Sequence, residues 1–445
     1  MSDTKPAAVG ARPWLPEPAL QREAGILASP AATGSGESVV ARIEALIDTN
    51  RTIHELECVN LNPATNVLNP RAEAALGGAL GSRPSLGYPG MKYEMGLEAI
   101  EEIEVLAAAL ACRVFSARYA EVRVGSGALA NLYTFMATCD PGDAVIVPPA
   151  SIGGHVTHNT AGAAGLFGLD IHEAPIDAER YTVDVDGVAA LAKQINPKLI
   201  TIGSSLNLVP HPVAELRAVA DSVGAHLLCD AAHMSALFGG AIWPDPLGQG
   251  AHVMTMSTYK SLGGPAGGVL LTNDAALAER IDAIAYPGLT ANFDAGKTAA
   301  LAITLVDWLE HGPAYAAEMV ATAAALASEL EGHGLTLQQT PEGPTRSHQF
   351  AVDAREWRGG HAASERLREA NILACAIGLP LDAGEPTMSG LRLGTPEAAR
   401  WGMAPEHMGE LGALVADALQ GDPTAVAGRT TDFRQRFTTM RFLAS

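Results

Sequence analysis

The sequence lacks several features that would place it in other classes of protein. No run of 18 apolar residues is present, so no membrane-spanning helix is expected. Basic residues form no block, and 29 Lys and Arg residues stand against 49 Asp and Glu residues, for a net charge of −20. Such an acidic chain is a poor partner for nucleic acid or for an anionic membrane surface. We therefore expect neither as a partner.

Cysteine is also scarce. The five cysteines, at positions 58, 112, 139, 229 and 375, are scattered and form no Cys-x-x-Cys pair. This usage is typical of reduced thiols in a cytoplasmic protein, and no metal site is expected. The first 40 residues have neither the basic start nor the apolar core of a signal sequence. Their Ala, Pro, Gly and Glu content predicts a loose arm.

What the chain does have is a regular alternation of short apolar runs and helix-like segments between residues 121 and 272. This pattern is typical of βαβ units. It predicts an α/β fold with a mostly parallel seven-stranded sheet and helices on both faces. The predicted strands are Glu121–Val124, Ala144–Val147, Leu169–Ala174, Leu199–Gly203, Leu227–Asp230, Val253–Met256 and Gly268–Thr272.

The length of 445 residues allows two or three domains. We expect an arm with a first helix at 1–50, a large domain at 51–312 and a small C-terminal α+β domain at 313–445. The small domain is expected to hold strands at Gln349–Val352 and Gly390–Leu393. The predicted helices are Ser38–Asn50, Leu97–Ala111, Pro212–Val223, Ala295–His311, Tyr315–His333, His361–Ala370 and Pro405–Leu419.

Lys260 and Asp230 form the most informative pair in the chain. Lys260 lies between two apolar runs, and Asp230 ends another run 30 residues upstream, followed by Ala-Ala-His233. A lysine on a short loop can form a Schiff base with an aldehyde cofactor, and a strand-end aspartate can keep a pyridine nitrogen protonated. The alternative is a helix-capping Asp230 and a surface lysine. The combination, with its Ser-rich and Gly-rich flanks, favours pyridoxal phosphate (PLP).

Three further positions suit a PLP site, each with a simpler alternative. Arg392 sits in an apolar strand, where an arginine is costly unless paired; a substrate carboxylate or an internal ion pair would serve. His155, in Gly153–His158, could stack on a ring or move protons, or be structural. Ser126, Gly127 and Ala128 open a helix whose N–H groups suit a phosphate, although an ordinary N-cap is an equal reading.

Several motifs resemble those of the serine (glycine) hydroxymethyltransferase family, in the order in which that family has them. They cover roughly residues 55–420. The segments are Gly87–Gly90, Gly153–His158, Asp230–His233, Thr258–Gly268, Tyr286–Leu289, Thr345–His348 and Ser389–Pro396.

This resemblance implies a fold-type-I PLP enzyme, similar to aspartate aminotransferase in fold. It implies a homodimer or homotetramer whose subunits share active sites. By position, Lys260 resembles the Schiff-base lysine and Asp230 the pyridinium partner. His155 resembles the ring-stacking histidine, and Arg392 the carboxylate clamp. The remaining cofactor contacts implied in this way are His233 and Ser205 at the ring hydroxyl, the segment Ser126-Gly127-Ala128, and Tyr259.

The chain also departs from the family pattern. Leu86 stands where the family has its catalytic glutamate, which serves one-carbon transfer to tetrahydrofolate. Leucine cannot transfer a proton. The family's Arg-Tyr-Tyr is here Lys92-Tyr93-Glu94, and the Ser-Glu-Asn that begins its substrate loop is here Ala64-Thr65-Asn66. The other changed positions are Pro84 for tyrosine, Tyr259 for histidine, Ala266 for arginine, Ala291-Asn292 for Gly-Gly, and Ala128 for the second serine of the phosphate loop.

These observations favour reversible aldol cleavage or formation of a β-hydroxy amino acid from a glycine- or alanine-type amino acid and an aldehyde. Little or no dependence on tetrahydrofolate is expected. The candidates for proton transfer are His155, Glu94 from a partner subunit, and Tyr93, with His155 ranked first because it should lie over the cofactor ring. Arg392, Asn66 and Tyr93 are the candidates for substrate binding. Three alternatives stay open. They are a folate-dependent hydroxymethyltransferase acting on serine or an α-substituted serine, a threonine transaldolase, and a non-enzymatic PLP-binding protein.

Overall fold

The computed structural model describes residues 12–29, 32, 34–382 and 388–444. The chain divides into two units, Met1–Cys58 and Val59–Ser445. In the first unit, α3 (Gly36–Arg51) is the helix predicted at Ser38–Asn50, and it is capped by the Ser35 side chain, which accepts from the Ser38 N–H. The predicted loose arm contains a further helix, α1 (Glu17–Leu27), which buries no residue and has a proline in its first turn.

In the second unit, a seven-stranded mixed sheet runs in the order β4-β12-β11-β10-β9-β5-β6. The expected α/β architecture is confirmed, with β12 as the one strand of this sheet that runs against the others. Every predicted run forms one of the strands. Their bounds are β4 (Tyr119–Val124), β5 (Ala144–Val147), β6 (Asp170–Glu173), β9 (Leu199–Ile202), β10 (His226–Asp230), β11 (Val253–Ser257) and β12 (Gly268–Thr272).

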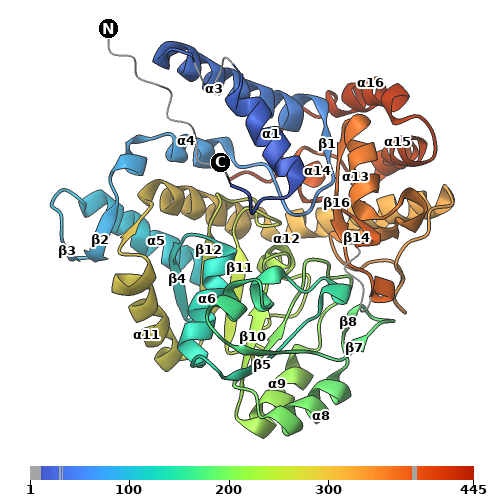
Figure 1. The fold of residues 1–445 in the computed structure, drawn as a ribbon. Helices are drawn as coiled ribbons and strands as arrows, with labels where there is room; N and C mark the ends of the chain where they lie inside the picture. Colours follow the sequence, from blue (N-terminus) through green and yellow to red (C-terminus); the bar gives the residue numbers. More distant parts are fainter. Residues whose placement is uncertain (1–11, 30–31, 33, 383–387, 445) are drawn as a thin grey trace. The chain divides into compact units, whose positions relative to one another are not determined.

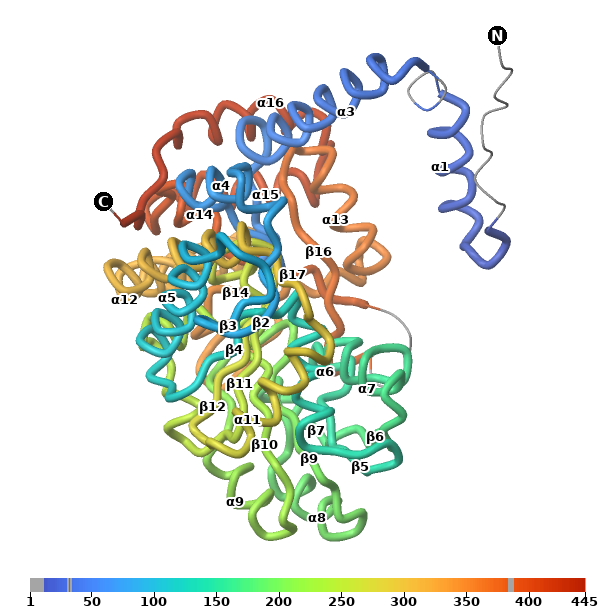
Figure 2. Tube along the Cα trace, turned by 90° about the vertical axis from the view of Figure 1, so that its left-hand side faces the viewer, coloured from blue at the N-terminus to red at the C-terminus, as the bar shows by residue number. Residues whose placement is uncertain are grey.

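Both faces of this sheet are buried, which is why its strands read as continuous apolar runs. Leu227 and Cys229 pack on one face of β10 and Leu228 on the other, because successive side chains of a strand point to opposite sides. Helices α5 (Glu98–Val114), α8 (Val185–Ile195), α9 (Val213–Val223) and α12 (Ala295–Gly332) contribute to the first core, and α6 (Gly127–Thr138), α7 (Ala163–Leu166) and α11 (Ala275–Ala283) to the second. In Figures 1 and 2, α8 and α9 lie together at one end of the sheet.

The helices predicted at Leu97–Ala111, Pro212–Val223, His361–Ala370 and Pro405–Leu419 are present as α5, α9, α13 and α15, and several further helices were not predicted. Helix α9 ends at Val223, and Gly224 follows in the left-handed conformation that glycine adopts without strain. The helices are α4 (Pro70–Leu76), α5 (Glu98–Val114), α6 (Gly127–Thr138), α7 (Ala163–Leu166), α8 (Val185–Ile195), α9 (Val213–Val223), α10 (Ser235–Gly239), α11 (Ala275–Ala283), α12 (Ala295–Gly332), α13 (Gly360–Glu369), α14 (Pro396–Arg400), α15 (Met408–Gln420) and α16 (Pro423–Arg434).

Two smaller sheets flank the main one. One has the order β14-β17-β16, and it lies beside α13 in both views. The other has the order β13-β2-β3. Their strands are β2 (Ser85–Tyr88), β3 (Met91–Lys92), β13 (Asn292–Phe293), β14 (Gln349–Asp353), β16 (Cys375–Ile377) and β17 (Gly390–Gly394). Two-stranded pairs complete the set: β1 (Val59–Asn60) with β15 (Ile372–Leu373), and β7 (Ile176–Asp177) with β8 (Thr182–Val183).

Two differences from the prediction concern the long helices of the C-terminal third. The helices expected at Ala295–His311 and Tyr315–His333 are one helix, α12, which continues through Pro313. A proline inside a helix costs about 3 kcal/mol, but Trp308 and Tyr315, on either side of it, are buried in one core. Helix α16 was not predicted, although Asp422 and Pro423 form a standard helix start.

The predicted division at residue 312 stays a prediction, and α12 crosses that position. Within the described ranges, none of the helices combines the length and the apolar character needed to cross a membrane.

A buried ion pair provides a test of this packing. The carboxylate of Asp307 accepts from Arg400 at 2.7 Å and from Asn69 at 2.9 Å, and both charged side chains are almost fully buried. Removing one partner leaves the other charge buried and uncompensated. Asp307→Ala should therefore lower the free energy of unfolding by about 3–5 kcal/mol, measured by urea denaturation. The matched control is Asp417→Ala, which breaks an exposed pair with Arg429; a loss above about 1 kcal/mol there would contradict this reasoning.

Candidate active site

The predicted cofactor residues come together at one edge of the seven-stranded sheet, where β4, β5, β9, β10 and β11 end. Ligands of open α/β sheets bind at this edge. Asp230 is the last residue of β10, and Lys260 follows β11. These side chains line a cavity of about 120 Å³. Its lining is Ser126, Gly127, Ala128, Asn131, His155, Ser204, Ser205, Asp230, Ala232, His233, Ser257, Tyr259 and Lys260.

Asp230 is held as a carboxylate by a set of hydrogen bonds. Its Oδ2 contacts Asn131 Nδ2 at 2.8 Å and His158 Nε2 at 2.9 Å, and its Oδ1 accepts the Ala232 N–H at 3.0 Å. Burial alone would raise the pKa of this carboxyl, but His158, Asn131 and the Ala232 N–H hold the pKa below its usual range. The group is therefore an anion that can keep a neighbouring pyridine nitrogen protonated.

Lys260 is a buried amine rather than the surface lysine of the alternative reading, with 6% of its area exposed. Burial lowers the pKa of Lys260 to about 8, with Asp230 opposing the shift and Arg392 adding to it. An amine with this pKa is mostly protonated at pH 7, but its neutral fraction is far larger than that of an ordinary lysine, and the neutral form is the nucleophile that attacks an aldehyde.

His155 is neutral near pH 7, because burial and the charge of Lys260 lower its pKa to about 4. The backbone N–H of Thr157 lies 3.3 Å from His155 Nδ1. A backbone N–H can only donate, so Nδ1 accepts and the proton of the neutral ring sits on Nε2. In this tautomer Nε2 carries the proton and has no free lone pair, and Nδ1 is already engaged as an acceptor. His155 is therefore better suited to contact a cofactor ring than to act as a general base.

Arg392 lies against two lining residues of the cavity, His233 and Ser205. Arg392 is 6% exposed and donates through Nη1 to the carbonyl of Ser205, with His233 Nε2 3.4 Å from the same nitrogen. No carboxylate of the described residues forms an ion pair with Arg392, so the internal salt bridge of the alternative reading is absent there. Burial, with Lys260 and Arg392, lowers the pKa of His233 well below its usual value.

The start of α6 forms the end of the cavity suited to a phosphate. Ser126 caps α6 by accepting from the Leu129 N–H. A Cβ on Gly127 would lie 2.2 Å from Ser257 Oγ, so only glycine lets this backbone approach the Ser257 hydroxyl. Backbone N–H groups at a helix start, next to a hydroxyl, favour an anion.

Several predicted or compared residues do not line this cavity; Arg392 is one of them, although it contacts the lining residues Ser205 and His233. Tyr93 and Glu94 are exposed beyond β3, and the Tyr93 N–H donates to the carbonyl of Leu86. Leu86 lies on β2, paired in register with Asn292 of β13. Asn66 instead contacts the Tyr315 hydroxyl, at 3.0 Å.

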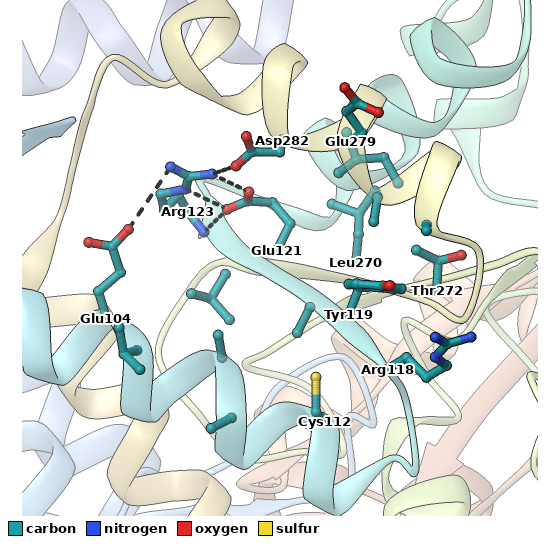
Figure 3. Close-up of a pocket in the computed structure, with 18 of the residues that line it drawn as sticks. Glu104, Cys112, Arg118, Tyr119, Glu121, Arg123, Leu270, Thr272, Glu279 and Asp282 are labelled. Atoms are coloured by element: carbon teal, nitrogen blue, oxygen red, sulfur yellow. Dashed lines mark hydrogen bonds and ion pairs between the residues drawn. The ribbon is translucent and has the colours of Figure 1, made fainter. Parts of the chain in front are cut away.

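A separate, larger hollow of about 580 Å³ lies between α5 and α11, over β4. Figure 3 shows Arg123 there among Glu104, Glu121 and Asp282. Arg123 Nη2 bonds Glu121 at 2.6 Å and Asp282 at 2.5 Å. Asp282 also accepts from Tyr88 on β2 at 2.7 Å. This network fixes the β2–β3 hairpin on the sheet.

Sequence reasoning missed several residues of the site. His158 and Asn131 both bond Asp230, and Ser257 faces Gly127. His158 lies inside a motif that resembles the family, so that signal was available. Asn131 carries no local signal, because its partners Asp230 and Thr255 are 99 and 124 residues away.

Comparison with known proteins agrees with this geometry. A family model described as serine hydroxymethyltransferase matches residues 38–415. An alpha-methylserine aldolase of Variovorax paradoxus is 58% identical over 437 residues, 98% of this chain and 99% of the relative. One of Ralstonia sp is 52% identical over 438 residues, covering 98% and 100%. A serine hydroxymethyltransferase of Methanopyrus kandleri is 37% identical over 390 residues, covering 87% and 91%.

The chain belongs to the serine hydroxymethyltransferase family. The resemblance stated from its motifs, the fold-type-I architecture and the aldol chemistry on a β-hydroxy amino acid are thereby confirmed. The protein is an enzyme acting on the Cα–Cβ bond of amino acids, and the cofactor of its family is PLP.

The residues present fit PLP. Among the described residues, His233 Nδ1 is a buried polar atom without a hydrogen-bond partner, at a cavity that also holds a buried amine and a buried carboxylate. An aldehyde, a ring nitrogen, a ring hydroxyl and a phosphate would match Lys260, Asp230, His233 and the start of α6, respectively.

The assignment of Lys260 predicts where the cofactor is attached. Reduction of the holoenzyme with borohydride should fix PLP on Lys260, because this amine is buried in the cavity and has a lowered pKa. Peptide mass spectrometry locates the adduct. Lys260→Ala should lose turnover and the adduct while retaining some PLP without a covalent bond. An adduct on another lysine would refute the assignment.

The close approach at Gly127 predicts weaker cofactor retention in Gly127→Ala. The new methyl group would displace the Ser257 hydroxyl, and one lost hydrogen bond to a charged group corresponds to about ten- to a hundredfold in affinity. The dissociation constant for PLP, from absorbance titration of the apoenzyme, measures it. Gly428→Ala is the control, since a Cβ there meets nothing within 4 Å. Equal PLP affinity in the two variants would contradict a role for the Gly127–Ser257 approach in binding the phosphate.

Proposed function

We propose that this enzyme cleaves α-methylserine to alanine and formaldehyde, reversibly and without tetrahydrofolate. The observation that carries the proposal is Leu86, which stands where the family has the glutamate that serves one-carbon transfer. An apolar side chain there can neither give nor take a proton. Two relatives at 52–58% identity are named alpha-methylserine aldolases, which supports the same substrate.

The residues of the cavity have the following proposed roles. Lys260 binds the cofactor aldehyde, Asp230 keeps the ring nitrogen protonated, and His155 contacts the ring. His233 and Ser205 contact the ring hydroxyl, and Ser126–Ala128 with Ser257 and Tyr259 hold the phosphate. Bound PLP supplies an electron sink for the pair left at Cα when Cα–Cβ breaks. Arg392 orients the amino acid by its carboxylate.

Proton transfer at the β-hydroxyl needs a group with a free lone pair. The Nε2–H tautomer and the pKa of about 4 make His155 a weak base. We therefore assign this step to Glu94 of a partner copy or to a bound water, with Tyr93 as a neighbouring contact. Glu94 and Tyr93 lie on an exposed hairpin end together with Met91 and Met95, which are 77% and 83% exposed.

This exposed apolar surface supports a homodimer, because monomers rarely leave such groups in water. In that assembly, the segment that carries Tyr93 and Glu94 would complete the active site of the partner subunit. The two subunits would then share their active sites, as the family resemblance implies. A tetramer is compatible with the same contact. We also keep the large domain at 51–312 and the small domain at 313–445 as a proposal.

A folate-coupled hydroxymethyltransferase is the second candidate. The Methanopyrus kandleri relative, named serine hydroxymethyltransferase, favours it. The two candidates differ in a single requirement, because transfer of the one-carbon unit needs an acceptor whereas aldol cleavage releases the aldehyde.

Formaldehyde release tests the proposal. The enzyme should cleave α-methylserine at a rate that tetrahydrofolate leaves nearly unchanged, and cleave serine more slowly. If Glu94 takes the hydroxyl proton, Glu94→Gln should lower kcat by about 10²–10⁴-fold with PLP retained. Glu98→Gln, an exposed change at the start of α5, is the control. A strict requirement for tetrahydrofolate would return the protein to the second candidate, and full activity of Glu94→Gln would assign the proton to water.

A further inference from the structure

Cys375 meets Arg392 inside the small sheet β14-β17-β16. The two residues are direct partners in the antiparallel register of β16 and β17. The sulfur of Cys375 lies 3.3 Å from Arg392 Nε and 3.1 Å from Nη2. It also lies 3.1 Å from Oδ1 of Asn62. One thiol thus joins the guanidinium to the loop that follows β1.

The direction of each hydrogen bond follows from the groups themselves. A guanidinium has no acceptor, so its Nε–H and Nη2–H donate to the sulfur. An amide oxygen has no proton, so the thiol S–H donates to Asn62. Asn62 Oδ1 also accepts the Ala64 N–H at 3.0 Å, which fixes that oxygen in place. The thiol is therefore satisfied as donor and as acceptor.

These contacts restrict how Arg392 can turn. The Nε–Nη2 edge is engaged by Cys375, and Nη1 donates to the carbonyl of Ser205. Such contacts on a planar group fix its rotation about the side-chain bonds. A neutral sulfur is a weak acceptor, so it orients the guanidinium without cancelling its charge. A carboxylate in the same place would form an ion pair with which the substrate would compete.

We propose that Cys375 is a positioning residue for the amino acid, acting through Arg392. Its thiol sets the orientation of the guanidinium and thereby the affinity of the site for the α-carboxylate. The inference rests on the proposed role of Arg392 as the carboxylate clamp. It also implies that alkylation of Cys375 blocks amino-acid binding while PLP stays bound, because the thiol contacts the clamp and does not line the cofactor cavity.

Steady-state kinetics of the PLP-loaded enzyme with α-methylserine provide the test. Cys375→Ala should raise KM about three- to tenfold, the range that one ordinary hydrogen bond corresponds to, and change kcat by less than about twofold. Cys375→Ser keeps a donor and an acceptor and should restore KM to near that of the unaltered enzyme. Cys112→Ala, which removes a half-buried thiol from α5, should leave KM and kcat unchanged.

A double-mutant cycle separates this inference from the function on which it rests. Arg392→Ala should weaken amino-acid binding strongly, and Cys375→Ala should add nothing in that background, because coupled residues are not additive. If Arg392→Ala leaves amino-acid affinity intact, the clamp itself is wrong. If only Arg392→Ala has an effect, or if Cys375→Ala weakens binding equally in both backgrounds, the inference about Cys375 is overturned.

Iodoacetamide gives an independent readout. The holoenzyme should lose amino-acid binding while the PLP absorbance band remains, alanine should protect it, and Cys375→Ser should resist. Cys112→Ala should remain as sensitive as the unaltered enzyme. Loss of the PLP band, or equal sensitivity of Cys375→Ser, would contradict the proposal.

Discussion

The carboxylate of Asp230, buried at the end of β10, is the constraint on which the rest of the site depends. An isolated buried carboxyl takes up a proton, and a neutral acid could not hold a ring nitrogen in its protonated form. Hydrogen bonds from Asn131, His158 and the Ala232 N–H prevent this. Asn131 in turn accepts from Thr255 of β11 at 2.7 Å. The charge therefore persists because α6, β10 and β11 are packed together.

The strand order places the other groups around this charge. Strand β10 lies between β9 and β11, so the loops that carry Ser205 and Lys260 flank Asp230. The reversed strand β12 makes β4 parallel to β11 and brings Ser126 to the same edge. Gly203 follows β9 with φ of +109°, and a Cβ there would lie 2.2 Å from the Asp230 carbonyl. The packing of the strands therefore determines both the fold and the positions of the charged groups in the cavity.

The sequence predicted most of this frame, because it depends on local patterns. Runs that are apolar on both faces identified the strands of the main sheet, and Lys260 and Asp230 carried the chemistry. Prediction failed where a distant contact decides the outcome. Tertiary burial around Trp308 and Tyr315 carries α12 through Pro313. The contact between Cys375 and Arg392 depends on the register of β16 and β17, which no spacing in the chain reveals.

The positive charge of Arg392, at the proposed position of the substrate carboxylate, is left without a negative partner within the described ranges. Arg392 is buried and has no carboxylate partner among the described residues, so its charge is available to an incoming anion. Leaving it so costs stability, since a buried unpaired cation is unfavourable. The Ser205 carbonyl and the thiol of Cys375 reduce that cost through hydrogen bonds and leave the charge in place. A site that binds an anion through a buried arginine must hold that positive charge uncompensated when the anion is absent. A thiol can hydrogen-bond the guanidinium without neutralising it, whereas an acidic residue would compete with the substrate carboxylate.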